Sequence, residues 1–436
     1  FIQDYDTLHI SACKFIKNMA KFSGAAISIS GVQNVSNFHL QFLLNSANIG
    51  SAVALHEVHT LWNINITFKG NTASTSVGAM QVATAIVVYI TKCFFISNKA
   101  FGKSAVGAVS IANINNVFIC NTLFVKNMAY IGGALRIMRG AVVKKNVVSV
   151  IINKTCFIEN MARGTRGGAI AIKGMTFIQI SYCQFSNNYA DLGGGAIFFT
   201  FSKRIVFMKS LAINNSAIDG AFSMISGCTY LLFSQSIFQR QHAQSIGGVL
   251  RLNHVKIHIN IGCLFKFTSG GAIYSTNGKK LINKFCHYKM NYGRGGAIWL
   301  HYIKVFVNNN TVFERNWSPS IGGAIAITSV NIVILYKSLF VENTAKQNGA
   351  ALRGYKVKLV KNIHCHYKGN VAQEGGSLWL DSVEEHRSVI SLFCIFETNK
   401  AFAGAVLFLV NTKSIQLQNC SFKNNSAKQF GAIYVS

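Results

Sequence analysis

The sequence predicts an all-β fold: a right-handed, single-stranded parallel β-helix of about 16 coils with about 27 residues per coil. Three observations predict it. One motif recurs along the whole chain, its side chains alternate as on β-strands, and no stretch shows the 3.6-residue period of an amphipathic helix. Three short strands with their turns leave too few residues for a βαβ crossover. Stacking each repeat on the next as one coil is the economical solution.

An asparagine marks each repeat. Of the sixteen positions in this column, fourteen hold Asn. They are Asn18, Asn45, Asn71, Asn98, Asn127, Asn160, Asn188, Asn215, Gln241, Thr268, Asn291, Asn316, Asn343, Asn370, Asn399 and Asn425. At an inward turn, Asn side chains in successive coils can pass amide hydrogen bonds from one to the next, as in stacked cross-β structures.

An aromatic ring stands three residues before the asparagine in fifteen repeats, and Ala212 is the exception. Two residues before the ring comes a small side chain, which is Cys in eight repeats and Ser or Thr in six. The cysteines are Cys13, Cys93, Cys183, Cys263, Cys286, Cys365, Cys394 and Cys420. A spacing of two places both side chains on one side of a strand, so we expect both to face the core.

A Gly-Ala pair follows the asparagine after a loop of variable length, and an apolar-x-apolar strand comes next, as in Gly167–Ile172. The glycine is expected to supply a backbone angle or a close approach that a Cβ would obstruct. A third apolar strand, such as the one holding Ile178 and Ile180, precedes the next Cys position.

The chain is expected to form one continuous β-helix over residues 1–436. It has a single proline, Pro319, no linker-like segment, and no run near the ~18 apolar residues of a membrane span. It starts at Phe1 without an initiator Met or a signal-peptide pattern and ends inside a repeat. We therefore expect a segment of a longer polypeptide.

The composition is strongly basic, with 42 Lys and Arg against 13 Asp and Glu, a formal net charge of +29. Such a charge favours polyanionic neighbours: acidic polysaccharide, nucleic acid, anionic lipid or an acidic protein. The lysines are spread along the chain and no nucleic-acid-binding motif is present, so a generally basic surface is the simpler interpretation.

Two signatures recur together: Phe-x-x-Asn, as in Phe124–Asn127, Phe157–Asn160 and Phe340–Asn343, and Gly-Gly-Ala-(Ile/Leu/Val). The second occurs at Gly132–Leu135, Gly167–Ile170, Gly194–Ile197, Gly270–Ile273, Gly295–Ile298 and Gly322–Ile325. Together they resemble the repeats of the chlamydial polymorphic outer membrane proteins. This resemblance covers essentially the whole chain. It implies a right-handed β-helix that acts as an extracellular or cell-surface adhesive scaffold, and it implies no catalytic residues or cofactors.

Parallel β-helices also carry polysaccharide lyases and hydrolases, which need clustered carboxylates. Four acids here are instead predicted to pair with basic residues one coil away, as ordinary ladder neighbours. The predicted pairs are Lys126 with Glu159, Lys289 with Glu314, Arg315 with Glu342, and Glu397 with Lys368 and Lys423. The one acidic cluster, Asp381, Glu384 and Glu385, is interpreted as a solvated loop rather than a cation site. We therefore predict that the chain is not an enzyme and holds no cofactor.

The cysteines form no CxxC pair, which argues against a metal site. Two Cys-His-Tyr-Lys stretches begin at Cys286 and Cys365, but adjacent residues of a strand point to opposite faces, so no metal is predicted. Buried free thiols are favoured, because Ser and Thr fill the same column elsewhere. Disulfides between stacked neighbours such as Cys394 and Cys420 stay an alternative.

The residue that faces outward in the strand after Gly-Ala gives the candidate binding strip. In the first half it reads Ser28, Ala54, Gln81, Ser110, Arg136, Ala171, Phe198 and Ser223. In the second half Ala326 is the exception among Arg251, Tyr274, Trp299, Arg353, Trp379, Phe408 and Tyr434. Rings and guanidinium groups at coil spacing suit sugar stacking with anion recognition, or a protein interface. Alternatively, aromatics are simply favoured on exposed strands, or another part of the protein covers them.

A second outward column lies just before the aromatic ring. It includes Phe94, Leu123, Leu211, Ile237, Leu264, Val312, Leu339 and Ile395. Apolar residues that point outward over several coils predict a covered face. The sequence thus predicts a non-catalytic scaffold or adhesin, with protein partners or self-assembly. The alternatives are a module that binds acidic polysaccharide and, less favoured, a polysaccharide lyase or hydrolase.

Overall fold

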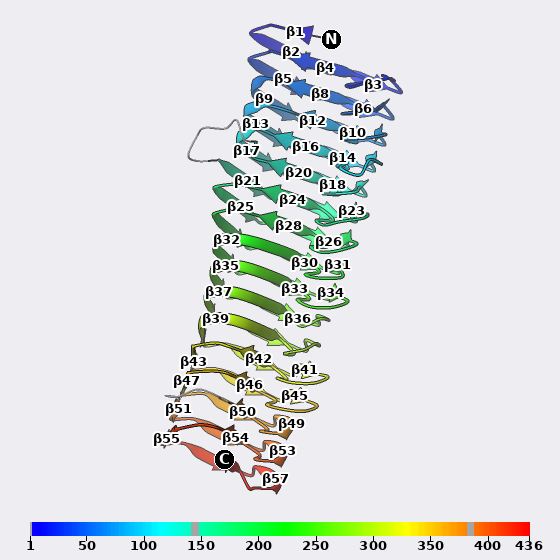
Figure 1. The fold of residues 1–436 in the computed structure, drawn as a ribbon. Helices are drawn as coiled ribbons and strands as arrows, with labels where there is room; N and C mark the ends of the chain where they lie inside the picture. Colours follow the sequence, from blue (N-terminus) through cyan, green and yellow to red (C-terminus); the bar gives the residue numbers. More distant parts are fainter. Residues whose placement is uncertain (1, 141–147, 382–387) are drawn as a thin grey trace. The chain divides into compact units, whose positions relative to one another are not determined.

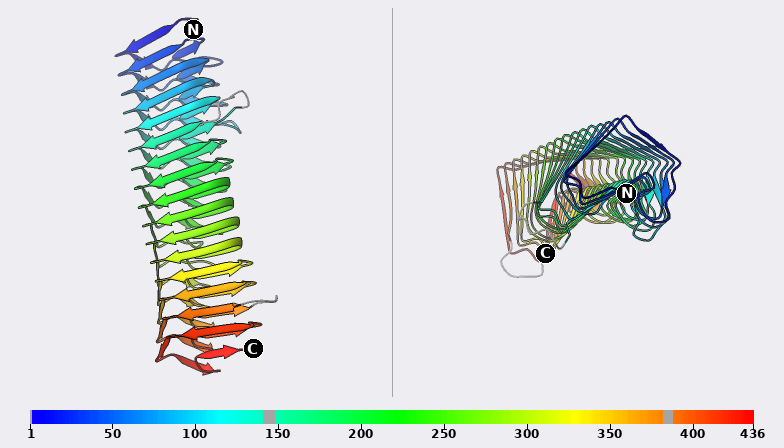
Figure 2. Two further views of the ribbon diagram at one scale, coloured as in Figure 1. Left: turned by 90° about the vertical axis from the view of Figure 1, so that its left-hand side faces the viewer. Right: turned by 90° about the horizontal axis from the view of Figure 1, so that it is seen from above.

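The computed structural model describes residues 2–140, 148–381 and 388–436. These residues form β-strands, turns and bends and no helix, in a parallel β-solenoid of about 16 turns whose equivalent positions lie about 27 residues apart (Figures 1 and 2). The predicted fold class is confirmed; the right-handed sense rests on the resemblance. Contacts divide the chain into two compact units, Phe1–Cys228 and Thr229–Ser436, which are described separately. One continuous β-helix over 1–436 stays a prediction.

A coil of the first unit shows the plan. It holds β24 (Ile170–Lys173), β25 (Phe177–Ser181), β26 (Gln184–Ser186) and β27 (Tyr189–Ala190). Each pairs in parallel with the equivalent strand of the next coil: β28 (Ile197–Thr200), β29 (Arg204–Met208), β30 (Leu211–Ile213) and β31 (Ser216–Ala217). Three strands per coil were predicted; the two-residue strand after the asparagine is an addition.

The strands that carry the aromatic ring pair in sequence order within each unit. In the first unit they are β3 (Lys14–Ile16), β6 (Gln41–Leu43), β10 (Thr67–Lys69), β14 (Phe94–Ile96), β18 (Leu123–Val125), β22 (Cys156–Ile158), β26 and β30. In the second they are β33 (Ile237–Gln239), β36 (Leu264–Lys266), β38 (His287–Lys289), β40 (Val312–Glu314), β44 (Leu339–Val341), β48 (His366–Lys368), β52 (Ile395–Glu397) and β56 (Ser421–Lys423).

Their rings stack face to face in the core. From Phe124 to Phe157 the ring centroids are 4.9 Å apart with planes 3° apart, and from Phe340 to Tyr367 the values are the same. The coil spacing of about 4.8 Å sets this distance. Since a fully buried Phe contributes roughly 1.5–3 kcal/mol of apolar transfer, these rings are the main apolar core of each unit.

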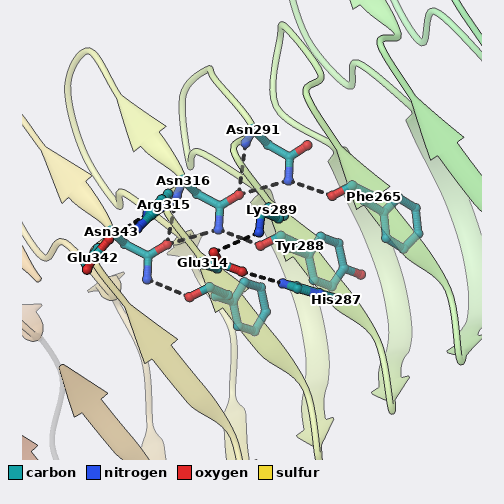
Figure 3. Close-up of polar contacts among 11 residues, drawn as sticks. Phe265, His287, Tyr288, Lys289, Asn291, Glu314, Arg315, Asn316, Glu342 and Asn343 are labelled. Atoms are coloured by element: carbon teal, nitrogen blue, oxygen red, sulfur yellow. Dashed lines mark hydrogen bonds and ion pairs between the residues drawn. The ribbon is translucent and has the colours of Figure 1, made fainter. Parts of the chain in front are cut away.

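The asparagine ladder forms as predicted (Figure 3). The Nδ2 of Asn316 donates to Asn343 Oδ1 at 3.0 Å and to the Tyr288 carbonyl at 2.9 Å. Its Oδ1 accepts from the Nδ2 and the backbone N–H of Asn291 at 2.8 Å and 3.1 Å. Every polar atom of the buried amide is thus used, which is the condition for keeping Asn in a core.

Two glycines before the alanine have separate roles. Gly167 has φ +74°, which strains an L side chain, whereas a Cβ on Gly168 would lie 2.0 Å from the carbonyl oxygen of Gly195 in the next coil. Both predicted reasons for glycine therefore hold, one at each position.

The ring that is missing at Ala212 is replaced by the ring of Phe222, and this arrangement overturns the prediction for Ser223. Phe222 takes the place of the usual alanine and packs edge-on against Phe185, with ring centroids 5.6 Å apart. This moves the strand by one residue: Phe198 pairs with Met224, and Ser223 faces the core at 1% exposure. The prediction that Ser223 faces outward is therefore wrong.

The strands that build the candidate surface lie in the second unit. They are β35 (Leu250–Ile261), β37 (Ile273–Lys284), β39 (Ile298–Asn309), β42 (Ile325–Thr328), β43 (Ile332–Tyr336), β46 (Leu352–Tyr355), β50 (Leu378–Asp381), β54 (Leu407–Val410) and β58 (Ile433–Val435). β35, β37 and β39 turn a corner at His254, Asn277 and Tyr302, each with positive φ. The corner separates two outward faces.

Candidate binding surface

The predicted strip stands in register on the first of these faces. Each residue pairs with the next across neighbouring strands, in the order Arg251, Tyr274, Trp299, Ala326, Arg353, Trp379, Phe408 and Tyr434. We call these eight residues the Arg/aromatic strip. Apart from the buried Ala326, all are half-buried. The predicted alignment of the seven site residues is therefore confirmed, while their binding role stays a prediction.

Rings and guanidinium groups of the strip contact one another. The Arg353 guanidinium lies 5.0 Å from the Trp379 ring centroid, and Arg294, from the preceding loop, lies 4.4 Å from that of Trp299. Tyr274 packs edge-on against Trp299 at 4.9 Å. In these cation–π contacts the guanidinium groups lie over aromatic rings. A partly desolvated cation is attracted to a ring more strongly than a fully solvated one.

Glu374 orients one of the rings. Its Oε2 accepts from Trp379 Nε1 at 3.0 Å and from Asn348 Nδ2 at 2.6 Å. Among the described residues, no ion pair involves Arg294 or Arg353. The carboxylate of Glu374 is thus engaged by Trp379 and Asn348.

His301 lies two residues beyond Trp299 on β39. Burial and the nearby Arg294 and Arg353 charges lower its pKa, so the imidazole is neutral near pH 7. Burial and the Arg294 charge also lower the pKa of Arg353, and Asp381 partly opposes this effect. The shared influence of two guanidinium groups places Arg294, His301 and Arg353 in one electrostatic cluster.

The second outward face was not predicted. Beyond the corner, the exposed Lys280 of β37 stands outward between Ile257 and Val305. Seven other outward residues of four neighbouring strands, β35, β37, β39 and β43, are branched, apolar and half-buried. They are Ile257, Ile259, Ile282, Val305, Val307, Ile332 and Ile334, which we call the apolar outward face. Its signal in the sequence is the alternation Ile257-His-Ile-Asn-Ile261, whose larger apolar residues point away from the core.

The core side of the same strands carries a second polar ladder. Asn260 Nδ2 donates to Asn283 Oδ1 at 2.8 Å, and Asn283 Nδ2 donates to Asn308 Oδ1 at 2.7 Å. His258, fully buried beside Asn260 at 2.9 Å, has its pKa lowered to about 4 by desolvation. Tyr288 replaces Phe in the ring stack where Asn283 is present to accept from its hydroxyl at 2.9 Å. On these strands, polar side chains thus face the core while apolar side chains face outward, which is the reverse of the usual pattern.

The predicted column before the aromatic ring does point outward, but it is not continuously apolar. His287 stands between Leu264 and Val312, and His366 stands between Leu339 and Ile395. Both histidines contact a glutamate of the next coil, so polar networks interrupt this surface.

Four predicted ion pairs form. The N–O distances are 3.6 Å for Lys126–Glu159, 2.9 Å for Lys289–Glu314, 2.6 Å for Arg315–Glu342 and 3.7 Å for Lys368–Glu397. Figure 3 shows the second and third of these pairs. Hydrogen bonds from Lys289 and then His287 lower the pKa of Glu314. Lys423 lies in register with Glu397. Of the predicted acidic cluster, Glu384 and Glu385 lie outside the described residues.

The eight cysteines of the inward column are thiols without disulfides. Cys183 Sγ lies 3.2 Å from the Ser181 carbonyl, to which it donates, and Ser210 Oγ donates to the Met208 carbonyl at 2.8 Å. In these coils the column thus supplies a small donor for the carbonyl two residues earlier, whereas Leu40 and Ile66 fill the same column without one. In the Cys-His-Tyr-Lys stretches, Cys286 is buried while His287 bonds Glu314 outside. The described residues contain no group of three or more potential metal ligands.

Burial predicts unequal reactivity of these thiols. It raises the pKa of Cys93 and Cys183 to about 12, whereas Cys13 is exposed. Because the thiolate is the reactive form, we expect iodoacetamide at pH 8 to label Cys13 at least 100-fold faster than Cys93 or Cys183, measured by peptide mass spectrometry. The same reaction in denaturant is the control, where the rates should converge. Equal native rates would contradict the burial of this column.

One segment of the first unit, which includes β26 and β27, matches a known repeat family. The family model of the Chlamydia polymorphic membrane protein repeat matches residues 182–200, which hold Cys183, Phe185, Asn188 and the Gly-Gly-Gly-Ala turn. The chain is a β-solenoid that carries a Pmp-type repeat. Members of that family are outer-membrane surface proteins.

Two curated proteins of Dictyostelium discoideum are also similar. The metabotropic glutamate receptor-like protein Q is 24% identical over 289 residues, 62% of this chain and 22% of that protein. Protein R of the same kind is 24% identical over 176 residues, 37% of this chain and 10% of that protein. The chain therefore spans under a quarter of each relative. No solved structure matches it. In the described part of the chain, no helix has the length and hydrophobicity of a membrane span.

Proposed function

We propose that this Pmp-type repeat chain is a non-catalytic scaffold of an extracellular or cell-surface protein. It attaches to other macromolecules through the outward faces of its second unit. The apolar outward face is the observation that carries the proposal. Branched apolar side chains point outward from four neighbouring strands, and surfaces of this kind mark interaction sites in soluble proteins.

Two further observations support a scaffold. The repeated residues are used for architecture: stacked rings, an asparagine ladder and glycines at close backbone approaches. In addition, four glutamates pair with Lys, Arg or His side chains: Glu159, Glu314, Glu342 and Glu397. A partner for the apolar outward face is then a protein surface, because the face offers few polar groups to a glycan.

Self-association tests this proposal. We expect sedimentation velocity to show concentration-dependent assembly that the double variant Val307→Thr/Ile334→Thr weakens at least tenfold. Threonine keeps the β-branched shape and strand preference while it removes apolar contact. Gln416→Thr, further along the same outward column, is the matched control and should assemble like the wild type.

Two outcomes would contradict the proposal. The first is a protein that stays monomeric at all concentrations and is retained on a hydrophobic-interaction column equally by wild type and double variant. The second is turnover of an acidic polysaccharide that a single Asp, Glu or Arg substitution abolishes, which would make the chain an enzyme.

A binding module for acidic polysaccharide is the second candidate function, and the Arg/aromatic strip favours it. Its rings and guanidinium groups stand on the other side of the corner from the apolar outward face. The two faces therefore suit two kinds of partner.

A further inference from the structure

A small, buried residue lies in the middle of the Arg/aromatic strip. Ala326 pairs with Trp299 on one side and Arg353 on the other, and it has the smallest side chain in the strip. The larger neighbours cover it to 1% exposure. Arg294 stacks on Trp299, so guanidinium groups lie on both sides of this small residue.

Two polar atoms of the electrostatic cluster lack hydrogen-bond partners. Among the described residues, none hydrogen-bonds to His301 Nε2 or Arg353 Nε, and both atoms are buried. The Arg353 Nη1 atom is 3.5 Å from Thr328 Oγ1, at the limit of a hydrogen bond. Leaving the Arg353 Nε–H donor unsatisfied costs about 1–3 kcal/mol, so a ligand oxygen that accepts from it would be stabilised. His301 Nε2 can donate to the same ligand in the tautomer that carries its proton there.

The positive charges of the cluster also favour a bound anion. Arg294 and Arg353 both act on His301, and Arg294 acts on Arg353. Glu374 is held by Trp379 and Asn348 rather than by either arginine. An anion between the two guanidinium groups would relieve their repulsion and form charge-assisted hydrogen bonds.

Aromatic rings extend from the cluster in both directions along the strip. Tyr274 and Trp299 lie toward one end, and Trp379 lies toward the other. Trp299 and Trp379 are three coils apart, which corresponds to about 14 Å at the strand spacing of sheets. A long ligand that carries anionic groups and has flat apolar faces fits this layout better than a small ion.

We propose that Arg294, His301 and Arg353 bind a carboxylate or sulfate group of an acidic polysaccharide, whose neighbouring sugar rings stack on Trp299 and Trp379. This inference rests on the proposed attachment function and identifies the partner of one of its two faces. Stacking distinguishes the ligand from a simple polyanion, since purely ionic attachment is screened by salt whereas ring contact is much less affected.

Binding to defined polysaccharides tests it. The full chain is titrated with polygalacturonate as the carboxylated ligand, chondroitin sulfate as the sulfated ligand and dextran as the neutral one, at about physiological and threefold higher salt. We expect binding to at least one acidic ligand and none to dextran. Arg353→Gln and Trp299→Ala should each weaken Kd tenfold or more, and part of the wild-type affinity should survive the higher salt.

Two further variants separate the cluster from net charge. Arg136→Gln makes the same charge change at an equivalent outward position of the first unit and should bind like the wild type. Arg294→Gln makes the same charge change within the cluster and should weaken Kd tenfold or more. Folding of every variant is checked by circular dichroism.

Several results would overturn the inference. Equal losses in Arg136→Gln and Arg353→Gln would show that only net charge matters, and equal affinity for single-stranded DNA would show a site for any polyanion. No binding to either acidic ligand, with self-association through the apolar outward face intact, would reject this site and leave the proposed function standing. Loss of both would reject both.

Discussion

Replacing Asn316 with alanine is expected to lower the free energy of unfolding by about 3–6 kcal/mol. The substitution leaves the Asn291 N–H without a partner and removes three further hydrogen bonds, to the Tyr288 carbonyl and to the side-chain amides of Asn291 and Asn343. Asn316 is fully buried, so water cannot replace these bonds. The unsatisfied N–H costs about 1–3 kcal/mol and each of the other three lost hydrogen bonds about 0.5–1.5 kcal/mol, and the expected range lies within their sum. Urea unfolding followed by circular dichroism measures it.

Two variants check that the ladder is the cause. Asn331→Ala changes an exposed asparagine of the same unit and should alter stability by less than about 0.5 kcal/mol. Asn316→Thr should cost less than Asn316→Ala, because Thr268 in this column donates to Asn291 Oδ1 at 2.8 Å. If all three variants unfolded at the same urea concentration as the wild type, the ladder would contribute nothing to stability.

The second large effect concerns the ring that compensates for Ala212. Phe222→Ala is expected to destabilise the first unit by about 3–5 kcal/mol, the usual cost of truncating a buried Phe. Phe222 is fully buried and contacts Phe185 and Phe207, with ring centroids 5.6 Å and 5.3 Å away. Ala212→Phe alone should cost about 1–3 kcal/mol, because Phe222 already fills the space.

The double variant Ala212→Phe/Phe222→Ala restores the arrangement of the other coils. We therefore expect it to be more stable than the sum of the single changes predicts, with a coupling of at least about 1 kcal/mol in a double-mutant cycle. Phe101→Ala, at an exposed ring of the same unit, is the control for loss of a Phe outside the core. Additive effects would mean that Phe222 and residue 212 do not share one space.

Most of the fold was predictable because, in a solenoid, residues one period apart in the sequence lie next to each other in space. The columns of Phe157, Asn188 and Cys183 could be aligned by eye, and their register follows directly once one coil is stacked on the next. The ion pair between Arg315 and Glu342 followed from the same alignment. The prediction was wrong at Ser223, where Phe222 stands in the alanine position and moves the strand by one residue.

The candidate site was predictable only in part. The alignment of Trp299, Arg353 and Trp379 follows from their fixed distance to the Gly-Ala turn. The participation of Arg294 and His301 does not follow from that distance. Arg294 comes from a loop and His301 lies two positions beyond Trp299, so only the direction of their side chains brings them to the strip. The apolar outward face was also missed, because the alternation Ile257-His-Ile-Asn-Ile261 does not by itself show that His258 and Asn260 face the core.

The sequence by itself determined the coil, its period, the inward columns and the outward position of the seven strip residues. These depend on spacing along the chain, which a repeat preserves from one coil to the next. Only the tertiary structure decided three further arrangements: Arg294 stacks on Trp299, larger neighbours cover Ala326, and the ring of Phe222 lies beside Phe185. Such contacts depend on side-chain size and direction at neighbouring coils, and no period in the sequence encodes them.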